Sequence, residues 1–488
     1  MKIVYLVDDA VHPWGGVQVV LRQADALHAR GHEVTVLCRS PAPTWYEPRC
    51  TFATVDDFGA IDAIDGSGGI LVGTWCRTVP STLGVPNAIP VHFCQGYEGD
   101  DPQHEDHLWT IERIYRLPAH KIVISDFLAR RVASLFGDRE MTVVPYGIRD
   151  DLFGPSTRDD RTPPRGRGHG PLRVGLIGPY DVPWKDIKVG IEALRIASGE
   201  RGIEVVRVSP TPITDRERAT WGDLRVEEHT AVDLERMASL YRTLDVFLGT
   251  SNGGAEGFFL PAVEAMASGV PCILTDIECF HTHGTDDDRL RADHAMFVPV
   301  GDAGAMARAI NELAVDRSLW SQLAKRGLEV ASHHTFSKHV DAIESVFSKL
   351  VAERSTTDCA VAGSASERGA MCNRMIDSAL ITRKQSGAHA AVSLARAACT
   401  LTPNSADAWL CLARILAETA DLSEARSAFE RARALCHDTP EIAWFEGRLA
   451  HVEGDTSEAA RCYERAIGLG HPGTRLRSEL ANLETCIC

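Results

Sequence analysis

The sequence predicts an α/β protein with two doubly wound domains that face a cleft, followed by a small all-α repeat domain. Short apolar runs alternate with amphipathic helical patterns over roughly the first 350 residues, which is typical of parallel sheets covered by helices. Residues 156–170 contain no aliphatic residue and divide this part into two. The strand patterns then stop, and alanine-rich helical patterns recur with a period of 34 residues.

The first domain is predicted at residues 1–155. Lys2–Val7 is an apolar run that predicts a buried strand, and Glu33–Arg39 predicts the next one. Between these strands, apolar residues recur at helical spacing, and Gly31 marks the end of the helix. This apolar stripe consists of Val17, Val20, Leu21, Ala24 and Leu27. Further strands are predicted at Ile70–Thr74, Ile89–Cys94, Lys121–Ser125 and Thr142–Pro145.

The second domain is predicted at residues 171–352. Residues 156–170 are rich in Pro, Gly, Arg and Asp, so they predict an exposed linker or long loop. Strands are then predicted at Leu172–Gly178, Glu204–Val208, Val246–Gly249 and Cys272–Thr275. Helices are predicted around Ile187–Ala197, Leu234–Thr243, Pro261–Ser268, Ala305–Ala314 and Phe336–Val351. Ligands bind at the carboxyl ends of such parallel strands, so we expect the site in the cleft.

A helical repeat is predicted at residues 372–473, after a second linker at 353–371 and before a tail at 474–488. Ala391, Ala425 and Ala459 are spaced by 34 residues, and Phe429 and Tyr463 keep the same spacing. The packing positions of one unit resemble the tetratricopeptide pattern; they are Trp409, Leu412, Leu416, Ala425, Phe429 and Ala432. Such an array predicts recruitment of a protein partner or acceptor, or dimerisation. The alternative is an appendage that only stabilises the chain.

Bulk composition narrows the function. The chain has 488 residues, too many for a single hydrophobic core. A formal net charge of -16 argues against general nucleic-acid binding, which needs a basic surface. The sequence shows neither a secretory signal nor an apolar run long enough to span a membrane, which predicts a cytoplasmic protein. Peripheral contact with a membrane surface is compatible with this. The 14 cysteines form no paired CxxC pattern, so no zinc site is expected.

The most informative segment is Ser251–Gly269, which follows the strand predicted at Val246–Gly249. Pro261 suits the first turn of a helix, so the residues before it present backbone N–H groups at a helix N-terminus. Such a terminus binds a diphosphate, and here it would be formed by Gly257, Phe258, Phe259 and Leu260. Two carboxylates accompany it. Glu264 on the helix can accept hydrogen bonds from a ribose diol, and Glu256 can reach sugar hydroxyls beyond the phosphates.

This segment resembles the signature of the retaining, family-four GT-B glycosyltransferases, E-G-F-G-L-P-x-x-E-A-M-A-x-G-x-P-V. The sequence reads EGFFLPAVEAMASGVPC, with Phe259 in place of the second glycine. The resemblance spans about residues 1–350 and implies two Rossmann-like domains: an acceptor domain first and a nucleotide-sugar donor domain second. It also implies sugar transfer from a nucleotide diphosphate with retention at the anomeric carbon. No metal or other cofactor is implied, because the helix dipole, the loop amides and a lysine do the work of a cation.

Further segments agree with this family. Gly15 and Gly16 lie between the first strand and the first helix, where backbone can approach a phosphate; an ordinary turn is the alternative. The passages Ser125-Asp126-Phe127 and Val144-Pro145-Tyr146-Gly147-Ile148 resemble the family's end of the first domain. Gly178-Pro179-Tyr180-Asp181-Val182-Pro183-Trp184-Lys185 resembles its "G-R-Y-D-x-P-x-K-G" passage, in which Lys185 matches a lysine that contacts the donor diphosphate.

Three positions depart from the family pattern. Pro179 replaces an arginine, which removes one of two cations at the phosphates, and Lys188 or Arg173 is a candidate replacement. Gln95 stands where the family often has a catalytic histidine, and Phe259 replaces the glycine already noted. His92 lies on the same strand as Gln95 and is expected to face the same side, so both join Glu256 as candidate catalytic residues. A structural role in the sheet is the alternative for His92.

The sequence therefore predicts a glycosyltransferase that acts on a glycan, lipid-linked or protein acceptor, in surface polysaccharide synthesis or protein modification. A nucleotide-sugar epimerase shares the fold but is not expected to carry the Glu256–Glu264 signature. A non-catalytic, nucleotide-sugar-binding scaffold that uses its repeats for partner binding is the second alternative. The base, the sugar, the acceptor and the oligomeric state stay open at this point.

Overall fold

The computed structural model describes residues 1–55, 58, 69–83, 88–101, 103–104, 108–137, 141–155, 171–199, 202–283, 293–357, 365–419, 421–436 and 439–470. The predicted linker 156–170 and the predicted tail 474–488 lie outside these residues. Contacts divide the chain into two compact units. The first unit holds both sheets. The second holds the C-terminal helices from Arg354 onward, together with the described residues 58, 77–83 and 88.

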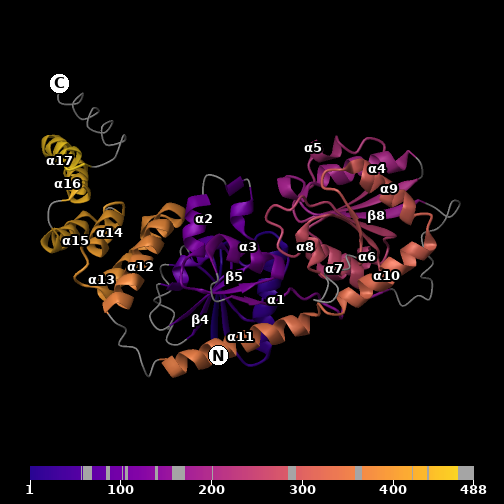
Figure 1. Ribbon diagram of the computed structural model, residues 1–488, viewed down its shortest axis with the longest axis horizontal. Coiled ribbons are helices and arrows are strands. Elements are labelled where there is room, and N and C mark those ends of the chain that lie inside the picture. Colours follow the sequence, from indigo (N-terminus) through magenta and orange to yellow (C-terminus); the bar gives the residue numbers. More distant parts are fainter. Residues whose placement is uncertain are drawn as a thin grey trace. The chain divides into compact units, whose positions relative to one another are not determined.

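The first sheet is entirely parallel, and its strand order is β3-β2-β1-β4-β5-β6-β7 (Figure 1). Its strands are β1 (Lys2–Val7), β2 (Glu33–Cys38), β3 (Thr51–Thr54), β4 (Ile70–Gly73), β5 (Ile89–Cys94), β6 (His120–Val123) and β7 (Met141–Val143). Its helices are α1 (Gly15–Ala29), α2 (Leu108–Tyr115) and α3 (Asp126–Phe136), with short 3₁₀ turns at Cys76–Thr78, Pro80–Leu83 and Glu98–Asp100. Gly31 follows α1 with φ +89°, a conformation that favours glycine as a helix stop.

The second sheet repeats this arrangement. It is also parallel, and its order is β10-β9-β8-β11-β12-β13. Its strands are β8 (Leu172–Ile177), β9 (Ile203–Ser209), β10 (Arg225–Thr230), β11 (Val246–Gly249), β12 (Cys272–Thr275) and β13 (Met296–Val298). Its helices are α4 (Ile187–Ser198), α5 (Asp215–Arg218), α6 (Leu234–Tyr241), α7 (Leu260–Ala267), α8 (Glu278–His281), α9 (Ala303–Leu313), α10 (Arg317–Ala331) and α11 (Phe336–Thr357); a 3₁₀ turn, η6, covers Pro183–Lys185.

Both sheets therefore have the same doubly wound order, with a switch point between the first and fourth strands of each. At such a point the connections leave in opposite directions and open a crevice outside the carboxyl ends of the strands. The predicted strands are confirmed at their positions. Three strands were not predicted: β3 and β10 are edge strands with polar or exposed side chains, and β13 is only three residues long. Edge strands bury less surface, so they carry no continuous apolar run.

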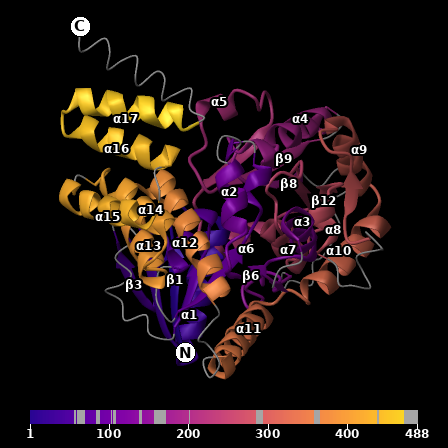
Figure 2. The same ribbon diagram turned by 60° about the vertical axis from the view of Figure 1, so that its left-hand side comes forward.

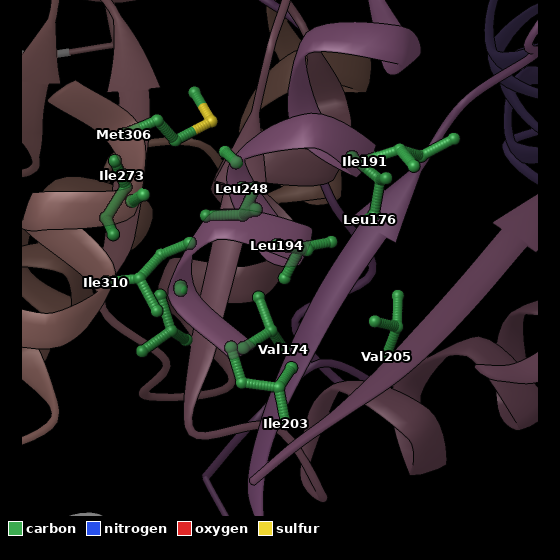
Figure 3. Close-up of a cluster of buried hydrophobic side chains, with 14 of the residues drawn as sticks. Val174, Leu176, Ile191, Leu194, Ile203, Val205, Leu248, Ile273, Met306 and Ile310 are labelled. Carbon is green, nitrogen blue, oxygen red and sulfur yellow. The ribbon is translucent and has the colours of Figure 1, made fainter. Parts of the chain in front are cut away.

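The core of the second sheet explains why its strands could be recognised. Branched aliphatic side chains of β8, β9 and β11 pack against the apolar faces of α4 and α9 (Figure 3). Leu176 and Leu248 are fully buried at neighbouring strands, and Leu194 and Ile310 meet them from the two helices. Burying each such side chain contributes about 1.5–3 kcal/mol. This packing holds the carboxyl ends of the strands in register beneath the site.

Helix α11 returns from the second sheet to contact α1 of the first. Arg30, just after α1, forms ion pairs with Asp341 at 2.6 Å and Glu344 at 2.5 Å. Deeper in the contact, Nε2 of His339 lies 2.8 Å from Oε1 of Gln23 and Nδ1 lies 2.8 Å from the carbonyl of Pro145. Buried polar groups need such partners, so these two contacts of His339 fix α11 more strongly than the exposed ion pairs of Arg30 do.

The C-terminal unit contains helices in consecutive pairs. These are α12 (Ala365–Ser386) with α13 (Ala388–Leu401), α14 (Ala406–Leu416) with α15 (Leu422–Leu435), and α16 (Pro440–Val452) with α17 (Thr456–Gly468). The two helices of the last pair lie side by side in Figure 2. Ala391, Ala425 and Ala459 are all fully buried, so the 34-residue period marks equivalent packing positions. The helical region is as expected, and its tetratricopeptide assignment stays a prediction.

Two surveys of the described residues bear on the composition. None of their helices is long and apolar enough to cross a membrane. Every described cysteine except Cys436 is buried, which agrees with a role as a small apolar side chain.

Candidate functional site

The candidate site is a cavity of about 360 Å³ at the carboxyl ends of both sheets. The loop after β1 lines it from the first sheet, together with residues that follow β5 and β7. From the second sheet come the loop after β8, the end of β9, and the segment from Ala255 to Leu260 that leads into α7. The cavity thus lies at the switch points of both sheets, and its size suits a small organic ligand.

The segment before α7 has a strained backbone. Phe259 is the residue that precedes the helix, and its φ of +61° and ψ of +70° are left-handed. Such a conformation costs about 1–2 kcal/mol for a residue with a Cβ, which explains why glycine is typical of this position. The Phe259 ring is buried against Phe247 and Phe280, with centroids 6.1 and 5.1 Å away. This packing offsets part of the strain.

Gly257 lets this loop approach the first sheet closely. A Cβ on Gly257 would lie 2.3 Å from the carbonyl oxygen of Gln95, so only glycine fits. The hydroxyl of Ser125, at the N-cap of α3, donates to the carbonyl of Gly257 at 2.8 Å. The two contacts hold the loop in place from the first sheet. The first N–H groups of α7 have no partner within the helix, as at any helix N-terminus, and the residues that carry them line the cavity.

Lys185 and Glu256 form an ion pair inside the cavity. Nζ of Lys185 lies 2.7 Å from Oε2 of Glu256, and the two side chains are only 16% and 6% exposed. The ammonium also lies 4.3 Å from the ring of Trp184 and 4.9 Å from the ring of Phe259. Each charge of this little-exposed pair is compensated by the other, so a ligand that displaces one partner has to supply a charge for the group left behind.

Side chains at the end of β11 position the lysine. Oγ1 of Thr250 donates to the carbonyl of Lys185 at 2.7 Å, and Oγ of Ser251 donates to the carbonyl of Trp184 at 3.0 Å. The next residue, Asp186, takes a left-handed conformation with φ +47°. These hydrogen bonds attach the 3₁₀ turn η6 to the end of the strand that precedes the signature segment. The passage that contains Lys185 and the signature segment are separate in the sequence, and this contact brings them together.

Glu264 lies on α7, where the side chain is partly exposed to the cavity. Its Oε2 accepts a hydrogen bond from the hydroxyl of Tyr241 at 3.0 Å. Desolvation raises the pKa of Glu264 to about 7, although the Tyr241 hydrogen bond and the charge of Arg22 both act to lower it. A carboxylate at this position can accept hydrogen bonds from a ligand diol when it is ionised.

Gly15 and Gly16 form the first turn of α1 and line the cavity. A Cβ on Gly16 would lie 2.5 Å from Oε1 of Gln95, whereas nothing lies near Gly15. Nε2 of Gln95 donates to the carbonyl of Thr74 at 2.9 Å, and its Oε1 accepts from the hydroxyl of Tyr146. The side-chain amide of Gln95 is thus held in place between the glycine turn and the signature loop. Its side-chain oxygen, Oε1, already accepts a hydrogen bond.

The expectation that His92 shares a face with Gln95 is wrong. The two residues are three apart, and alternate residues of a strand face opposite sides. His92 does not line the cavity. It is 1% exposed, and its ring lies 4.9 Å from that of Tyr115. Burial and the charge of Lys121 lower the pKa of His92 well below its usual value. The position of His92 therefore fits the alternative, a structural role in the sheet.

Two cations of the cavity were missed. Arg22 lies on α1, where Gly15, Gln18 and Val19 line the cavity at the same helical spacing. Arg149 follows β7 and lines the cavity as well. The sequence does contain a signal for a second face of α1, beside the apolar stripe. It is the helical spacing of Gly15, Gln18, Val19 and Arg22. Only the fold shows that this face meets the second sheet.

Neither candidate replacement for the missing arginine reaches the cavity. Pro179 lines it, as expected for its place after β8. Arg173 instead forms ion pairs with Glu204 at 3.1 Å and Glu227 at 2.7 Å, and Lys188 lies over the ring of Tyr180. Both expectations are wrong because these side chains are engaged elsewhere in the second sheet. The run Asp286–Asp288, which the sequence favours as a solvated loop, lies outside the described residues.

No group of three or more His, Cys, Asp or Glu side chains suited to a metal occurs within the described part of the chain. The cavity polar groups are instead amides, one ion pair, a partly exposed carboxyl group and two arginines. This set suits a ligand that carries both anionic and hydroxyl groups.

Comparison with known proteins agrees with this chemistry. Residues 171–316 match the sequence profile of the family described as Glycosyl transferases group 1. The phosphatidyl-myo-inositol mannosyltransferase of Mycolicibacterium smegmatis is 29% identical over 220 residues, which are 44% of this chain and 54% of that protein. The MMP alpha-(1->4)-mannosyltransferase of Mycolicibacterium hassiacum is 30% identical over 171 residues, which are 34% and 38%. The chain thus spans about half the length, or less, of these curated relatives.

Solved structures agree on the fold. Sucrose-phosphate synthase from Thermosynechococcus elongatus superposes with a TM-score of 0.59 at 19% identity, over 72% of this chain and 100% of that one. Anabaena HepE in complex with UDP-glucose superposes with a TM-score of 0.60 at 14% identity, over 72% and 100%. The two parallel sheets with their helices therefore have the Rossmann-like architecture of GT-B proteins.

Proposed function

We propose that this chain is a metal-independent glycosyltransferase that takes a sugar from a nucleotide-diphosphate donor with retention of the anomeric configuration. One observation carries the proposal: Lys185, Glu256 and Glu264 lie in one cavity with the N-terminus of α7. The matched family profile, which covers all three residues, supports it.

The donor diphosphate is placed between the first turns of α7 and α1. Helix N-termini carry a partial positive charge and unsatisfied N–H groups, which suit a diphosphate. In this placement Gly257, Phe258, Phe259 and Leu260 supply amides from one side, and the Gly15–Gly16 turn supplies them from the other. Lys185 then leaves Glu256 and pairs with the phosphates, where its charge stabilises the departing nucleotide.

The two glutamates bind different parts of the donor. Glu264 accepts hydrogen bonds from the ribose diol, and its charge is needed for this. Glu256, released from Lys185, accepts hydrogen bonds from hydroxyls of the transferred sugar. Gln95 faces the sugar from the first sheet and takes a positioning role, because its amide is held by Thr74 and Tyr146.

The acceptor is a glycan, a lipid-linked sugar or a protein, and the setting is surface polysaccharide synthesis in the cytoplasm. The curated relatives are named for mannosyl transfer, one of them to phosphatidyl-myo-inositol, which supports a mannosyl donor and a lipid or glycan acceptor here. The C-terminal helices are proposed to be tetratricopeptide-like and to recruit a protein partner. Contact with a membrane surface is compatible with a lipid-linked acceptor.

The test is calorimetric titration of the full chain with UDP, GDP, dTDP and ADP, each with EDTA present. Binding of one diphosphate in EDTA supports the donor site and identifies the base. Release of that nucleotide from its sugar conjugate, only when an acceptor is supplied, supports transfer. Tight binding without any turnover would favour the non-catalytic scaffold, which is motivated by the departures from the family pattern at Pro179, Gln95 and Phe259. A change in the sugar without transfer would favour an epimerase.

A further inference from the structure

Three arginines gather on the first helices of successive C-terminal pairs. Arg383 lies on α12, Arg414 on α14 and Arg448 on α16. Arg414 and Arg448 are 34 residues apart, so they occupy the same position of the repeat. Trp444 lies between them: its ring centroid is 4.9 Å from Cζ of Arg414 and 5.5 Å from Cζ of Arg448. Both guanidinium groups thus stack on one aromatic side chain.

This cluster has fewer counter-charges than other arginines of the same unit. Arg396 pairs with Glu424 at 2.8 Å, Arg433 pairs with Glu446 at 3.0 Å, and Arg426 pairs with Glu453. In the cluster, Arg383 pairs with Glu418. Among the residues that the structure describes, no carboxylate pairs with Arg414 or Arg448.

The environment makes this arrangement unfavourable for an isolated chain. Burial lowers the pKa of Arg414, and the charges of Arg383 and Arg448 lower it further, although the charge of Glu418 acts in the opposite direction. The three arginines and Trp444 are each partly exposed as residues. Like charges at this spacing repel, and cation–π contacts compensate only in part. An anion that bridges the arginines would remove the repulsion.

The spacing of the charges favours an extended peptide over a single small anion. Helix α12 packs against α14, and packed helices lie about 8–10 Å apart, so Arg383 is about one such step from Arg414, while Arg414 and Arg448 share the Trp444 ring. An extended chain advances about 3.3 Å per residue, so side chains three residues apart match one step. The chain's net charge of -16 opposes adsorption to a broad anionic bilayer, whereas a short segment meets only the local arginines.

We propose that this cluster, made of Arg383, Arg414, Arg448 and Trp444, binds an acidic, extended segment of a partner protein. The carboxylates of the segment pair with Arg414 and Arg448, and an apolar side chain between them rests on the exposed edge of Trp444. The site is independent of the donor cavity, so its occupancy does not depend on the identity of the nucleotide sugar.

The experiment is fluorescence anisotropy of the full chain with a fluorescein-labelled peptide of Glu-Glu-Leu repeats and its Gln-Gln-Leu counterpart. We expect the acidic peptide to bind and the neutral one to bind at least about tenfold more weakly, because charge-assisted hydrogen bonds are roughly twice as strong as neutral ones. The double variant Arg414→Gln/Arg448→Gln should lose about tenfold or more in affinity, and added salt should weaken the wild type.

The matched control is Arg461→Gln on α17. This side chain is 72% exposed and pairs only within its own helix, so it removes one charge outside the cluster. An equal loss in Arg461→Gln, equal binding of both peptides, or full binding by the double variant would overturn the proposal. Circular dichroism melts establish that each variant is folded, and Arg448→Gln alone replaces the double variant if that one unfolds. Sedimentation with phosphatidylserine vesicles, without peptide binding, would overturn it in favour of a membrane surface.

Discussion

The two walls of the donor cavity are built differently. The wall from the second sheet relies on unusual backbone: Asp186, Ala231 and Phe259 are the non-glycine residues with positive φ among those described, and all three lie in or beside the cavity. The wall from the first sheet has regular backbone and contributes long polar side chains, Arg22 and Arg149 among them.

This difference separates a preorganised half from an adaptable half. Strained backbone persists only where packing over-determines it, so the second-sheet wall presents fixed amides to a ligand of constant shape. On the first-sheet wall, Arg22 donates to Gln18 at 3.0 Å and Arg149 pairs with Asp151 at 2.5 Å, but such long side chains can change rotamer when a ligand offers another partner. We therefore expect substitutions in the second-sheet wall to change the affinity for the nucleotide. Substitutions in the first-sheet wall should instead change the use of acceptors and, to a smaller extent, the pKa of groups in the cavity.

The largest expected effect is on transfer by Glu256→Gln. The variant keeps the shape but loses the charge that receives Lys185 in the free enzyme and the sugar hydroxyls in the complex. Removing one such polar contact at a transition state typically costs about 10²–10³-fold in rate. Binding of the diphosphate alone should be unchanged or tighter, since Lys185 no longer has to leave a carboxylate. Steady-state transfer and calorimetry measure the two effects, with Glu192→Gln, exposed on α4, as control. Normal transfer would contradict the assignment.

Lys185→Gln should weaken diphosphate binding by about 10- to 100-fold, because it removes the one lysine aimed at the phosphates. The change also leaves Glu256 buried without its partner, so stability should fall, and Lys185→Gln/Glu256→Gln should recover it. Lys188→Gln is the control, since that side chain lies over Tyr180 outside the cavity. If Lys188→Gln weakened binding as much as Lys185→Gln, the second-sheet wall would have been assigned the wrong lysine.

Glu264 makes nucleotide binding depend on pH. Its pKa is raised to about 7, and only the ionised form accepts both diol hydrogen bonds. Affinity should therefore rise with pH by up to about tenfold per unit below 7 and level off above it. The contribution of Glu264 to stability has the opposite sign: between the unfolded pKa near 4.5 and the folded pKa near 7, the folded state binds the extra proton, so this contribution declines as pH rises. Buried histidines with lowered pKa values, such as His294 and His339, act the other way, so the contribution of Glu264 is read as the difference between the wild type and Glu264→Gln. Calorimetry and urea unfolding across this range measure both effects, and the rise in affinity should be absent in Glu264→Gln.

A smaller effect is expected from relief of strain at Phe259. Phe259→Ala and Phe259→Gly both lose the ring packed on Phe247 and Phe280, which costs about 3–5 kcal/mol in each case. Only glycine also removes the penalty of the left-handed backbone, so Phe259→Gly should be more stable than Phe259→Ala by about 1 kcal/mol. Urea unfolding compares the pair. Equal stability would mean that the loop changes conformation when the ring is removed.

The two walls also differ in how far the sequence predicts them. Lys185, Glu256 and Glu264 were predicted because each lies in a contiguous passage after a buried strand, where local pattern and family resemblance agree. Arg22 and Arg149 were not predicted, because their role depends on which face of α1 and which turn after β7 meet the other sheet. The same limit applies to the fold. Inner strands such as β4, which reads as ILVG, are continuous apolar runs, whereas the edge strand β10 reads as RVEEHT and has Val226 as its one aliphatic residue.

The smallest expected effect tests whether the walls act independently. The charge of Arg22 lowers the pKa of Glu264 across the cavity, so Arg22→Gln should raise the midpoint of the pH-dependent binding by less than about one unit. Arg22→Lys keeps a charge at this place and should shift the midpoint less. Arg149→Gln is the matched control, because Arg149 acts on Arg22 and is not among the groups that shift Glu264. If the midpoint shifts in Arg22→Gln and not in Arg149→Gln, the charge on the adaptable wall sets part of the pKa of Glu264 on the preorganised wall. An unmoved midpoint would mean that solvent screens the two walls from each other, and that the first sheet serves only the acceptor.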